Sequence, residues 1–437
     1  MNFNNKELFP MDVGINSDDC LTLGGLDVLQ LTKEFGTPLY VYDEGTIRTM
    51  CREFVEEFSS RYKNTLVAYA SKAFINPAIA SLINDEHMGL DVVSAGEIAV
   101  ARSVDFPPEK IYFHGNNKTP DEIEFALDYG IGHFVVDSFS ELQILEEISN
   151  NRGIKQDILL RVSPGVDPHT HHLTTTGITD SKFGFSIETG DASHAIQTAL
   201  KSKDLDLKGI HFHLGSPIFE LEPYSQGIGV VLDFLQQFQK DGLDLREFSP
   251  GGGFAIGYVK EQLPPSIAEY ADVIVQSVIE GCSRNGFNLP KIVVEPGRSI
   301  TGRAGVALYT VGAIKNIPTV RKYVSLDGGM GDNIRPALYD AKYEAVLANR
   351  MSEPPREVVT LAGKFCESGD VLIKDILLPE LISGDIVALP SSGAYAPSMA
   401  SNYNLNPRPP IVMVDNGKIR LIRRRETYKD LMLCDQI

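Results

Sequence analysis

The sequence lacks the features that mark nucleic-acid-binding, membrane-spanning and disulfide-bonded proteins. Its formal net charge is −18, and its basic residues form no run longer than Arg423-Arg424-Arg425, which argues against a nucleic-acid or anionic-membrane partner. No stretch reaches the roughly 18 apolar residues of a membrane span, and residues 1–14 lack the regions of a signal peptide. The five cysteines are scattered and form no C-x-x-C pair, which disfavours a disulfide framework. We therefore expect a cytoplasmic protein with free thiols.

From residue 64 onward, short apolar runs alternate with segments of helical pattern. We expect strands at 65–70, 89–94, 111–115, 132–137, 157–163, 208–214, 245–249 and 291–296. We expect helices at 76–86, 96–104, 119–129, 139–150, 190–202, 223–241 and 264–284. Eight strands separated by helices predict a parallel (β/α)8 barrel. An open doubly wound sheet is the alternative, but no G-x-G-x-x-G follows the first strand.

The pattern changes after about residue 305, where strand-like runs follow one another with little helix between them. These runs are 307–314, 322–327, 357–362, 385–390, 410–414 and 418–423. Asn416-Gly417, between the last two, is typical of a hairpin turn. We predict a barrel at 37–305, a mostly-β domain at 306–437, and an N-terminal segment at 1–36 that joins the β-domain.

Polar or glycine residues follow all eight predicted barrel strands. Active sites of such barrels lie at the C-terminal ends of the strands, so these residues are expected on one face. They are Lys72, Asp91 with Ser94, His114, Asp137, Arg161, His213, the turn Gly251-Gly252-Gly253, and Glu295 with Arg298. Each alone is weak evidence, because polar residues are common in such loops, but together they predict an active site.

Lys72 ends an apolar strand, where a lysine either reaches out to solvent or serves as a nucleophile that can form a Schiff base. Glycines 251–253 form either a tight turn or a cradle whose N–H groups bind a phosphate. Glu295 can serve as a general base, a metal ligand or the partner of a ring nitrogen, and Arg298 lies after the eighth strand, where such barrels often bind phosphate. Taken together, these residues indicate pyridoxal phosphate, with His213 stacked on its ring.

A metal-dependent hydrolase is the competing class of enzyme. His211 and His213 share one face of a strand because side chains alternate with a period of two. Three further candidates lie in a polar loop: His169, His171 and His172. This reading leaves Lys72 and the glycine turn without a role, so no metal is expected.

At the level of motifs, the chain resembles the fold-type III pyridoxal-phosphate decarboxylases, whose fold is alanine racemase-like, over about residues 20–430. The barrel motifs are Tyr69-Ala-Ser-Lys72, Gly89-Leu-Asp-Val-Val-Ser-Ala-Gly-Glu97, His114-Gly-Asn-Asn-Lys118, Ser181-Lys-Phe-Gly184, His211-Phe-His-Leu-Gly-Ser216, Gly251-Gly-Gly253 and Glu295-Pro-Gly-Arg298. Four later motifs resemble the diaminopimelate branch of this family: Asp327-Gly-Gly-Met330, Arg335-Pro-Ala-Leu-Tyr339, Cys366-Glu-Ser-Gly-Asp370 and Ser392-Gly-Ala-Tyr395. Ser249-Pro250 departs from the family pattern, and we expect it to lie outside the chemistry.

The resemblance implies decarboxylation of meso-2,6-diaminopimelate to L-lysine and CO2, the last step of lysine biosynthesis. It implies Lys72 as the residue that links pyridoxal 5′-phosphate and Cys366 as the proton donor. The implied cofactor-binding residues are Lys72, Asp91, His213, Ser216, Gly251, Gly252, Gly253, Glu295, Pro296, Gly297, Arg298 and Tyr395. The implied substrate-binding residues are Arg298, Arg335, Tyr339, Glu367 and Tyr395. In the family, the counterparts of Cys366 and Glu367 complete the active site of the other subunit, which implies a homodimer.

Three other activities remain open on the same scaffold. A decarboxylase of ornithine, lysine or arginine would keep the chemistry but would leave Arg335 without a carboxylate to bind. An amino-acid racemase would need a second base opposite Lys72, and the run Cys366–Asp370 disfavours it. A non-catalytic pyridoxal-phosphate carrier would not need the motifs of the C-terminal domain.

Overall fold

The computed structural model describes residues 5–167, 175–177 and 181–436 and divides the chain into two compact units. The barrel unit consists of Met50–Ala255 and Pro264–Gly297, and the β unit of Met1–Thr49, Ile256–Leu263 and Arg298–Ile437. This division differs from the boundaries expected at residues 36 and 305. Strand β4 (Leu39–Asp43) explains the first difference, because it pairs with two strands of the β unit.

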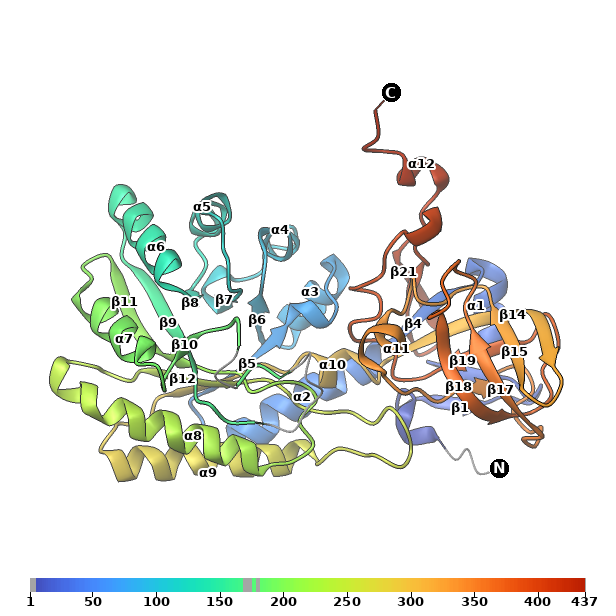
Figure 1. Cartoon of the computed structure of the whole chain (residues 1–437), viewed down its shortest axis with the longest axis horizontal. Helices are drawn as coiled ribbons and strands as arrows, with labels where there is room; N and C mark the ends of the chain where they lie inside the picture. The colour runs from blue at the N-terminus through green and yellow to red at the C-terminus, as the bar shows by residue number, and fades with distance from the viewer. Residues whose placement is uncertain (1–4, 168–174, 178–180, 437) are drawn as a thin grey trace. The chain divides into compact units, whose positions relative to one another are not determined.

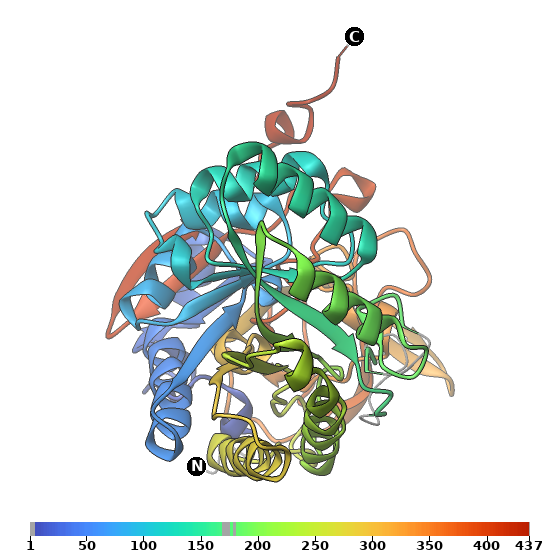
Figure 2. The ribbon, with the colours of Figure 1, turned by 90° about the vertical axis from the view of Figure 1, so that its left-hand side faces the viewer.

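The barrel unit is a closed ring of eight parallel strands, as predicted (Figure 2). In spatial order the strands are β5 (Thr65–Ala70), β6 (Gly89–Val92), β7 (Ile111–Phe113), β8 (His133–Val136), β9 (Gln156–Ser163), β11 (Leu205–His211), β12 (Glu247–Gly251) and β13 (Lys291–Val294). Strand β13 pairs with β5 and closes the ring. A two-residue strand, β10 (Phe185–Ser186), adds to β9.

Helices alternate with these strands and surround them (Figure 2). They are α2 (Glu44–Arg61), which begins in the β unit, α3 (Pro77–Asp85), α4 (Ala95–Arg102), α5 (Pro120–Tyr129), α6 (Phe139–Arg152), α7 (Asp191–Lys201), α8 (Glu222–Leu235) and α9 (Ile267–Asn285). Side chains set where several of them begin. Thr119 forms a capping box with Glu122 at the start of α5, and Ser266 forms one with Glu269 at the start of α9.

Side chains fill the barrel, so it is a packed core and not a pore. Ala68, Tyr112, Val135, Leu159 and Val293 form an apolar cluster contributed by five strands. A polar cluster lies at the N-terminal ends of the strands, where Glu247 accepts a hydrogen bond from the Tyr112 hydroxyl at 2.8 Å and lies 3.2 Å from His133 Nε2. With this end occupied by packed side chains, the C-terminal ends are left for a binding site.

The β unit is built from two sheets (Figure 1). The smaller has β1 (Val13–Ile15), β2 (Leu21–Leu23) and β3 (Leu26–Asp27). The larger has, in spatial order, β18 (Val371–Leu378), β17 (Glu357–Ala362), β15 (Arg321–Leu326), β14 (Gly305–Ile317), β4, β20 (Ile411–Asp415) and β21 (Lys418–Arg423), with β19 (Ile386–Leu389) joining β14 to β16 (Val346–Leu347). Its short helices are α1 (Val28–Phe35), α10 (Arg298–Thr301), α11 (Arg335–Tyr339) and α12 (Tyr428–Leu431).

The turn between β20 and β21 confirms the predicted hairpin. Asn416 and Gly417 both have positive φ, at 46° and 77°, which a two-residue type I′ turn requires. Asp415 and Lys418 then face each other as the first antiparallel pair. Among the described residues, no helix has both the length and the apolar character needed to cross a membrane.

Candidate active site

Lys72 lies just beyond the C-terminal end of β5, in the short 3-10 helix η2 (Ser71–Ala73). Its Nζ is 3.2 Å from Oδ2 of Asp91, because β5 and β6 pair with Ala70 opposite Asp91. The Asp91 side chain is fully buried, whereas 39% of the Lys72 side chain is exposed. The amine is therefore held by a carboxylate at a position that a ligand can reach.

Lys118 has the opposite environment. Its Nζ donates to the carbonyl oxygens of Gly115 and Val135, each at 2.9 Å, and to Glu141 Oε1 at 2.7 Å. Both charged side chains are almost completely buried. The three donor positions of this ammonium are therefore used inside the protein, which assigns Lys118 a structural role.

Glu295 follows β13 and is buried beside His211, Ser249 and His114. Its Oε2 is 3.1 Å from Nε2 of His211, the last residue of β11. Its Oε1 accepts a hydrogen bond of 2.9 Å from Ser249 Oγ on β12 and lies 3.4 Å from Nε2 of His114. Ser249, which we expected to lie outside the chemistry, thus contacts a predicted cofactor residue.

These contacts decide the protonation of the buried groups. Burial by itself raises the pKa of Glu295, but His211 and His114 outweigh this effect and lower the pKa below its ordinary value. Burial lowers the pKa of His114 well below its ordinary value, and the charge of Glu295 opposes this effect. Desolvation also lowers the pKa of His213, and the charges of Lys72 and Arg161 add to the effect.

The glycine turn ends β12 beside His213. Gly252 donates its N–H to His213 Nδ1 at 3.2 Å, and Gly251 donates to Ser249 Oγ at 3.2 Å. A Cβ at Gly252 would lie 2.2 Å from the carbonyl oxygen of Glu295, and one at Gly253 would lie 2.6 Å from that of Gly215. Backbone segments thus approach one another here more closely than any side chain would allow. Ser216 lies one residue beyond Gly215 and is partly buried.

Pro296 and Gly297 join the Glu295 segment to the Lys72 segment. The Ala70 N–H donates to the Pro296 carbonyl oxygen at 3.0 Å. A Cβ at Gly297 would meet the Ala70 Cβ at 2.9 Å and the Ala70 carbonyl oxygen at 3.0 Å. The two predicted cofactor segments are therefore packed directly against each other.

The residues at this end of the barrel fit the predicted cofactor. Buried polar atoms without a hydrogen-bond partner in the described chain include Asp91 Oδ1, His114 Nε2 and His211 Nδ1. Such atoms are rare in folded proteins and indicate a polar ligand. A reachable amine, an ionised carboxylate and a glycine turn are the groups that pyridoxal phosphate needs for its aldehyde, ring nitrogen and phosphate.

The β unit brings together two buried arginines and three tyrosines. Arg298 donates from Nη1 to the Tyr258 hydroxyl at 2.6 Å, and its guanidinium lies 4.7 Å from the Tyr395 ring centre. Arg335, the first residue of α11, donates from Nη1 to the Tyr343 hydroxyl and lies 4.5 Å from the Tyr258 ring centre. Both arginine side chains are buried. This cluster joins three predicted residues to Tyr258 and Tyr343.

Arg335 has no carboxylate partner among the described residues, and its neighbours are phenols. Burial raises the pKa of Tyr258, but Arg298 and Arg335 outweigh it and lower the pKa below its ordinary value. A buried guanidinium without a counter-ion is costly, so the cluster is suited to an anionic ligand.

Tyr395, a member of this cluster, and Tyr339 at the end of α11 are also predicted site residues. Tyr395 adopts a left-handed backbone conformation, with φ of 68°, which is a rare state for an aromatic residue and is often found at functional sites. Tyr339 is the last residue of α11 and is partly buried.

Cys366 and Glu367 are both exposed, on the turn that connects β17 to β18. Asp370 holds this turn, because its carboxylate accepts hydrogen bonds from the N–H groups of Met330 at 2.6 Å and Phe365 at 2.8 Å. Cys366 itself donates its N–H to Asn404 Oδ1 at 2.8 Å. The turn is thus well anchored, while Cys366 and Glu367 on it are exposed.

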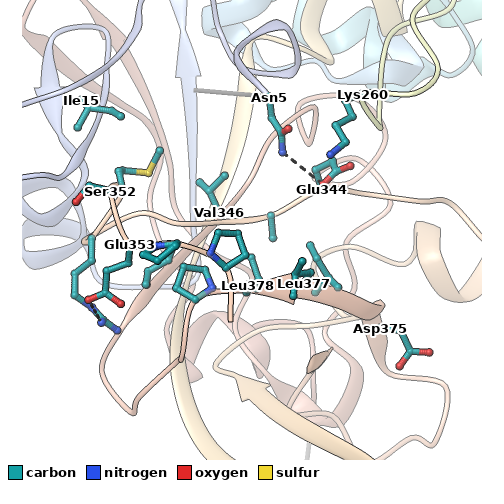
Figure 3. Close-up of a pocket in the computed structure, with 18 of the residues that line it drawn as sticks. Asn5, Ile15, Lys260, Glu344, Val346, Ser352, Glu353, Asp375, Leu377 and Leu378 are labelled. Atoms are coloured by element: carbon teal, nitrogen blue, oxygen red, sulfur yellow. Dashed lines mark hydrogen bonds and ion pairs between the residues drawn. The ribbon is translucent and has the colours of Figure 1, made fainter. Parts of the chain in front are cut away.

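A hollow of about 660 Å³ elsewhere in the β unit contains none of the predicted site residues (Figure 3). Its lining includes Asn5, Lys260, Glu344, Val346 and Leu377, and the Asn5 amide approaches Glu344 at 3.5 Å. Burial raises the pKa of Glu344, while Lys260 opposes the rise. The hollow is therefore not the predicted cofactor site.

The structure also tests the metal alternative. The donor atoms of His114, His211 and Glu295 lie within 4.8 Å of one another, whereas His213 is bonded to the glycine turn and is not part of this group. His169, His171 and His172 lie outside the described residues. The sequence singled out the pair His211 and His213, but the fold joins His211 to His114 and Glu295.

Comparisons with known proteins agree with the predicted family. Residues 44–302 match the family model described as pyridoxal-dependent decarboxylase, pyridoxal binding domain. The diaminopimelate decarboxylase of Bacillus subtilis (strain 168) is 46% identical over 421 residues, which cover 96% of both chains. That of Staphylococcus aureus (strain COL) is 43% identical, covering 97% of this chain and 100% of its own.

Solved structures give the same result. The diaminopimelate decarboxylase of M. jannaschii in complex with L-lysine superposes with a TM-score of 0.91 at 36% identity, covering 97% of this chain and 98% of that one. The Helicobacter pylori enzyme in complex with L-lysine has a TM-score of 0.85 at 35% identity, covering 93% and 98%.

Proposed function

The chain belongs to the diaminopimelate decarboxylase family of pyridoxal-dependent decarboxylases, and on this basis we propose that it converts meso-2,6-diaminopimelate to L-lysine and CO2. This is the last step of lysine biosynthesis. The observation that carries the choice of substrate is Arg335, a buried guanidinium whose neighbours are tyrosines. The distal carboxylate of diaminopimelate supplies the missing anion, and a guanidinium can bind it through two parallel hydrogen bonds.

Lys72 would link pyridoxal 5′-phosphate covalently, Glu295 would meet its ring nitrogen, and His213 would stack on the ring. Ser216, the turn Gly251–Gly253 and Arg298 would bind its phosphate, and Tyr395 would contact both cofactor and substrate. When bound, the cofactor withdraws electrons from the bond to the leaving carboxylate. Asp91 contacts the Lys72 amine at 3.2 Å and orients it for exchange with the amine of the substrate.

Substrate selection depends on both ends of the distal group. Arg335 binds the distal carboxylate, Glu367 meets the distal amine, and Tyr339 and Tyr395 complete the contacts. Ornithine and lysine have the amine but no distal carboxylate, so they leave Arg335 buried and unpaired. An unpaired charged group of this kind lowers affinity by at least about 1–3 kcal/mol.

Cys366 returns a proton to the carbon that has lost CO2. Because Cys366 and Glu367 are exposed on a firmly held turn, we assign them to the site of a partner subunit in a homodimer. A sulfur that acts in its own chain would more naturally point into the unit that carries it. We place the enzyme in the cytoplasm, since none of its cysteines forms a disulfide and a reducing compartment keeps thiols free.

Deuterium incorporation tests the proposed reaction. Purified enzyme with added pyridoxal phosphate is incubated with meso-diaminopimelate in D2O, and the product is examined by mass spectrometry and NMR. We expect L-lysine with one carbon-bound deuterium, located at the carbon that lost CO2. Recovery of diaminopimelate with deuterium at its α-carbons and no lysine would identify a racemase and contradict the proposal.

A further inference from the structure

Three side chains surround Glu295 before any ligand is considered. His211 Nε2 lies 3.1 Å and Ser249 Oγ lies 2.9 Å from the carboxylate oxygens, within hydrogen-bond distance. His114 Nε2 lies 3.4 Å from Oε1 without forming a hydrogen bond. The register of β11 and β12, which sets His211 opposite Ser249, brings two of these side chains to adjacent positions. The rings of His114 and His211 pack edge to face with their centres 4.8 Å apart.

The distances also indicate where the protons lie. His211 Nε2 and Glu295 Oε2 are 3.1 Å apart, and because an ionised carboxylate can only accept, an ionised Glu295 requires the hydrogen of this contact to be on Nε2. Nδ1 of the same ring is buried without a partner in the described chain. Asp91 lies on the other side of His114, with its Oδ1 3.7 Å from His114 Nε2. The negative charge of Asp91 raises the pKa of Glu295 and so opposes its ionisation. Without the histidines, Glu295 would be a buried carboxyl facing a second acid with Ser249 as its one close donor.

We propose that His211 and His114 are positioning residues that keep Glu295 ionised and fix its two oxygens, so that the ring nitrogen of the cofactor meets a carboxylate. The proposal rests on the role of Glu295 proposed above. A neutral carboxylic acid in this position would not stabilise a proton on the ring nitrogen, and the unprotonated ring is a weaker electron acceptor. The histidines thus act on the cofactor through Glu295, without touching the reacting atoms.

The same three groups could in principle bind a metal, but the distances favour hydrogen bonds. A metal requires the lone pairs of both histidines to face one ion. At 3.1 Å from a carboxylate oxygen, His211 Nε2 is at ordinary N–H···O distance.

The chain offers a matched control at the other end of the same strands. His133, the first residue of β8, lies 3.2 Å from Glu247, and both side chains are largely buried. This pair is at the N-terminal ends of the strands, where barrels carry structural residues and no chemistry. A change at His133 therefore measures the effect of losing a buried histidine–carboxylate contact alone.

The test measures the protonation of the cofactor ring nitrogen directly. Wild-type enzyme and its variants are loaded with 15N-labelled pyridoxal phosphate, and the ring-nitrogen resonance is recorded at pH 8 without substrate. We expect a protonated nitrogen in wild type, a shift toward the unprotonated position in His211→Leu, and a return toward wild type in His211→Gln, whose amide can donate. We expect a smaller shift in the same direction in His114→Leu and none in His133→Leu.

A second readout does not require the cofactor. In the apoenzyme, the infrared band of a protonated carboxylic acid should appear in His211→Leu and vanish in the double variant with Glu295→Gln. If His211→Leu does not fold, His114→Leu provides the same two readouts with a weaker expected effect.

The outcomes separate this inference from the proposed function. If Glu295→Gln leaves the ring-nitrogen signal unchanged, Glu295 is not the partner of the ring and both statements fail. If Glu295→Gln shifts the signal but the variants at His211 and His114 do not, the role of Glu295 stands and the positioning role is overturned. Stoichiometric divalent metal that stays with the wild type through purification and is lost in His211→Leu would also overturn it.

Discussion

The surroundings of an amine decide whether it is available for chemistry, as Lys72 and Lys118 illustrate. Both are lysines of sequence motifs near the ends of barrel strands. Lys118 is enclosed by two carbonyl oxygens and a carboxylate, whereas Lys72 has a carboxylate at 3.2 Å and a side chain that is 39% exposed. The sequence places both lysines near strand ends. Their contacts distinguish Lys72, which we propose to be reactive, from the structural Lys118.

Replacing each lysine by alanine should therefore have different results. Lys72→Ala should abolish the visible absorbance of covalently held cofactor and leave the unfolding midpoint close to that of wild type. Lys118→Ala leaves Glu141 buried without its partner, so it should lower the free energy of unfolding by about 3–5 kcal/mol. Folded Lys118→Ala should still show the absorbance. Retention of the absorbance in Lys72→Ala would contradict the assignment.

The tyrosines of the β unit allow the two arginines to be tested separately. Tyr343→Phe removes the hydrogen bond to Arg335, and bonds to charged groups contribute about 1.5–3 kcal/mol. We expect KM for meso-diaminopimelate to rise about tenfold or more, since 1.4 kcal/mol corresponds to a factor of ten. Cofactor affinity, measured by absorbance titration, should stay near that of wild type.

Tyr258→Phe is the matched variant, because it removes the bond to Arg298 and leaves the Tyr343 contact in place. Here the weakened step should be cofactor binding. Equal effects of the two variants on both constants would show that the arginines do not have separate roles.

The barrel carries two separate polar clusters, one at each end of its strands. At the N-terminal ends, Glu247 contacts the Tyr112 hydroxyl and His133, and Lys291 Nζ lies 3.3 Å away. At the C-terminal ends, Glu295 contacts His211 and Ser249. The first cluster joins four strands and stabilises the ring, and the second is placed where a ligand can use it.

The first cluster predicts a loss of stability in acid. Burial raises the pKa of Glu247, but His133, Lys291 and Tyr112 outweigh it and lower the pKa from 4.5 to about 2. The ionised carboxylate is thus favoured in the folded state, so its contribution is complete above about pH 4.5 and is lost as pH falls toward 2. Wild type should lose roughly 2 kcal/mol more than Glu247→Gln between pH 7 and pH 3. Urea unfolding at both pH values measures this difference, and equal losses would contradict it.

Much of this architecture could be predicted from the pattern of apolar runs. The eight barrel strands were placed within a few residues because each is a short apolar segment between clear helix signals, such as Thr119-Pro120 and Ser266. Strand β18 was missed. Lys374-Asp375 interrupts its apolar pattern, and Asp375 adopts φ of 56° where the pairing with β17 shifts register. The sheet partners of strand β4 lie hundreds of residues away and leave no local signal.

The site was predictable where it rests on motifs and unpredictable where it rests on side-chain packing. Lys72, Glu295 and the glycine turn belong to motifs of the family. The contacts of Glu295 with His211 and His114 require the ring to close, and Tyr258 lies in a loop with no recognisable pattern. Ser249 was set aside because of its unusual residue type, although strand register places it against the carboxylate.

At the level of the assembled enzyme, the proposed division of labour between subunits can be tested by mixing inactive chains. Lys72→Ala and Cys366→Ala are unfolded together and refolded as one sample. If each site takes Lys72 from one chain and Cys366 from the other, half of the dimers are mixed and each has one intact site, which restores about a quarter of wild-type activity.

Refolding each variant alone provides the background to subtract. Recovery no greater than the mean of the two separate samples would show that both residues act within one chain, and would end the assignment of Cys366 to the partner's site.

The most direct measurement is a product assay on four separate amino acids. Purified enzyme with pyridoxal phosphate is offered meso-diaminopimelate, L-ornithine, L-lysine and L-arginine, and CO2 and the amine products are quantified. We predict CO2 and L-lysine from meso-diaminopimelate alone, because only this substrate has a second, distal carboxylate for Arg335 to bind. Comparable turnover of any of the three basic amino acids would contradict the proposed selection, and the absence of CO2 from all four would contradict the proposed function.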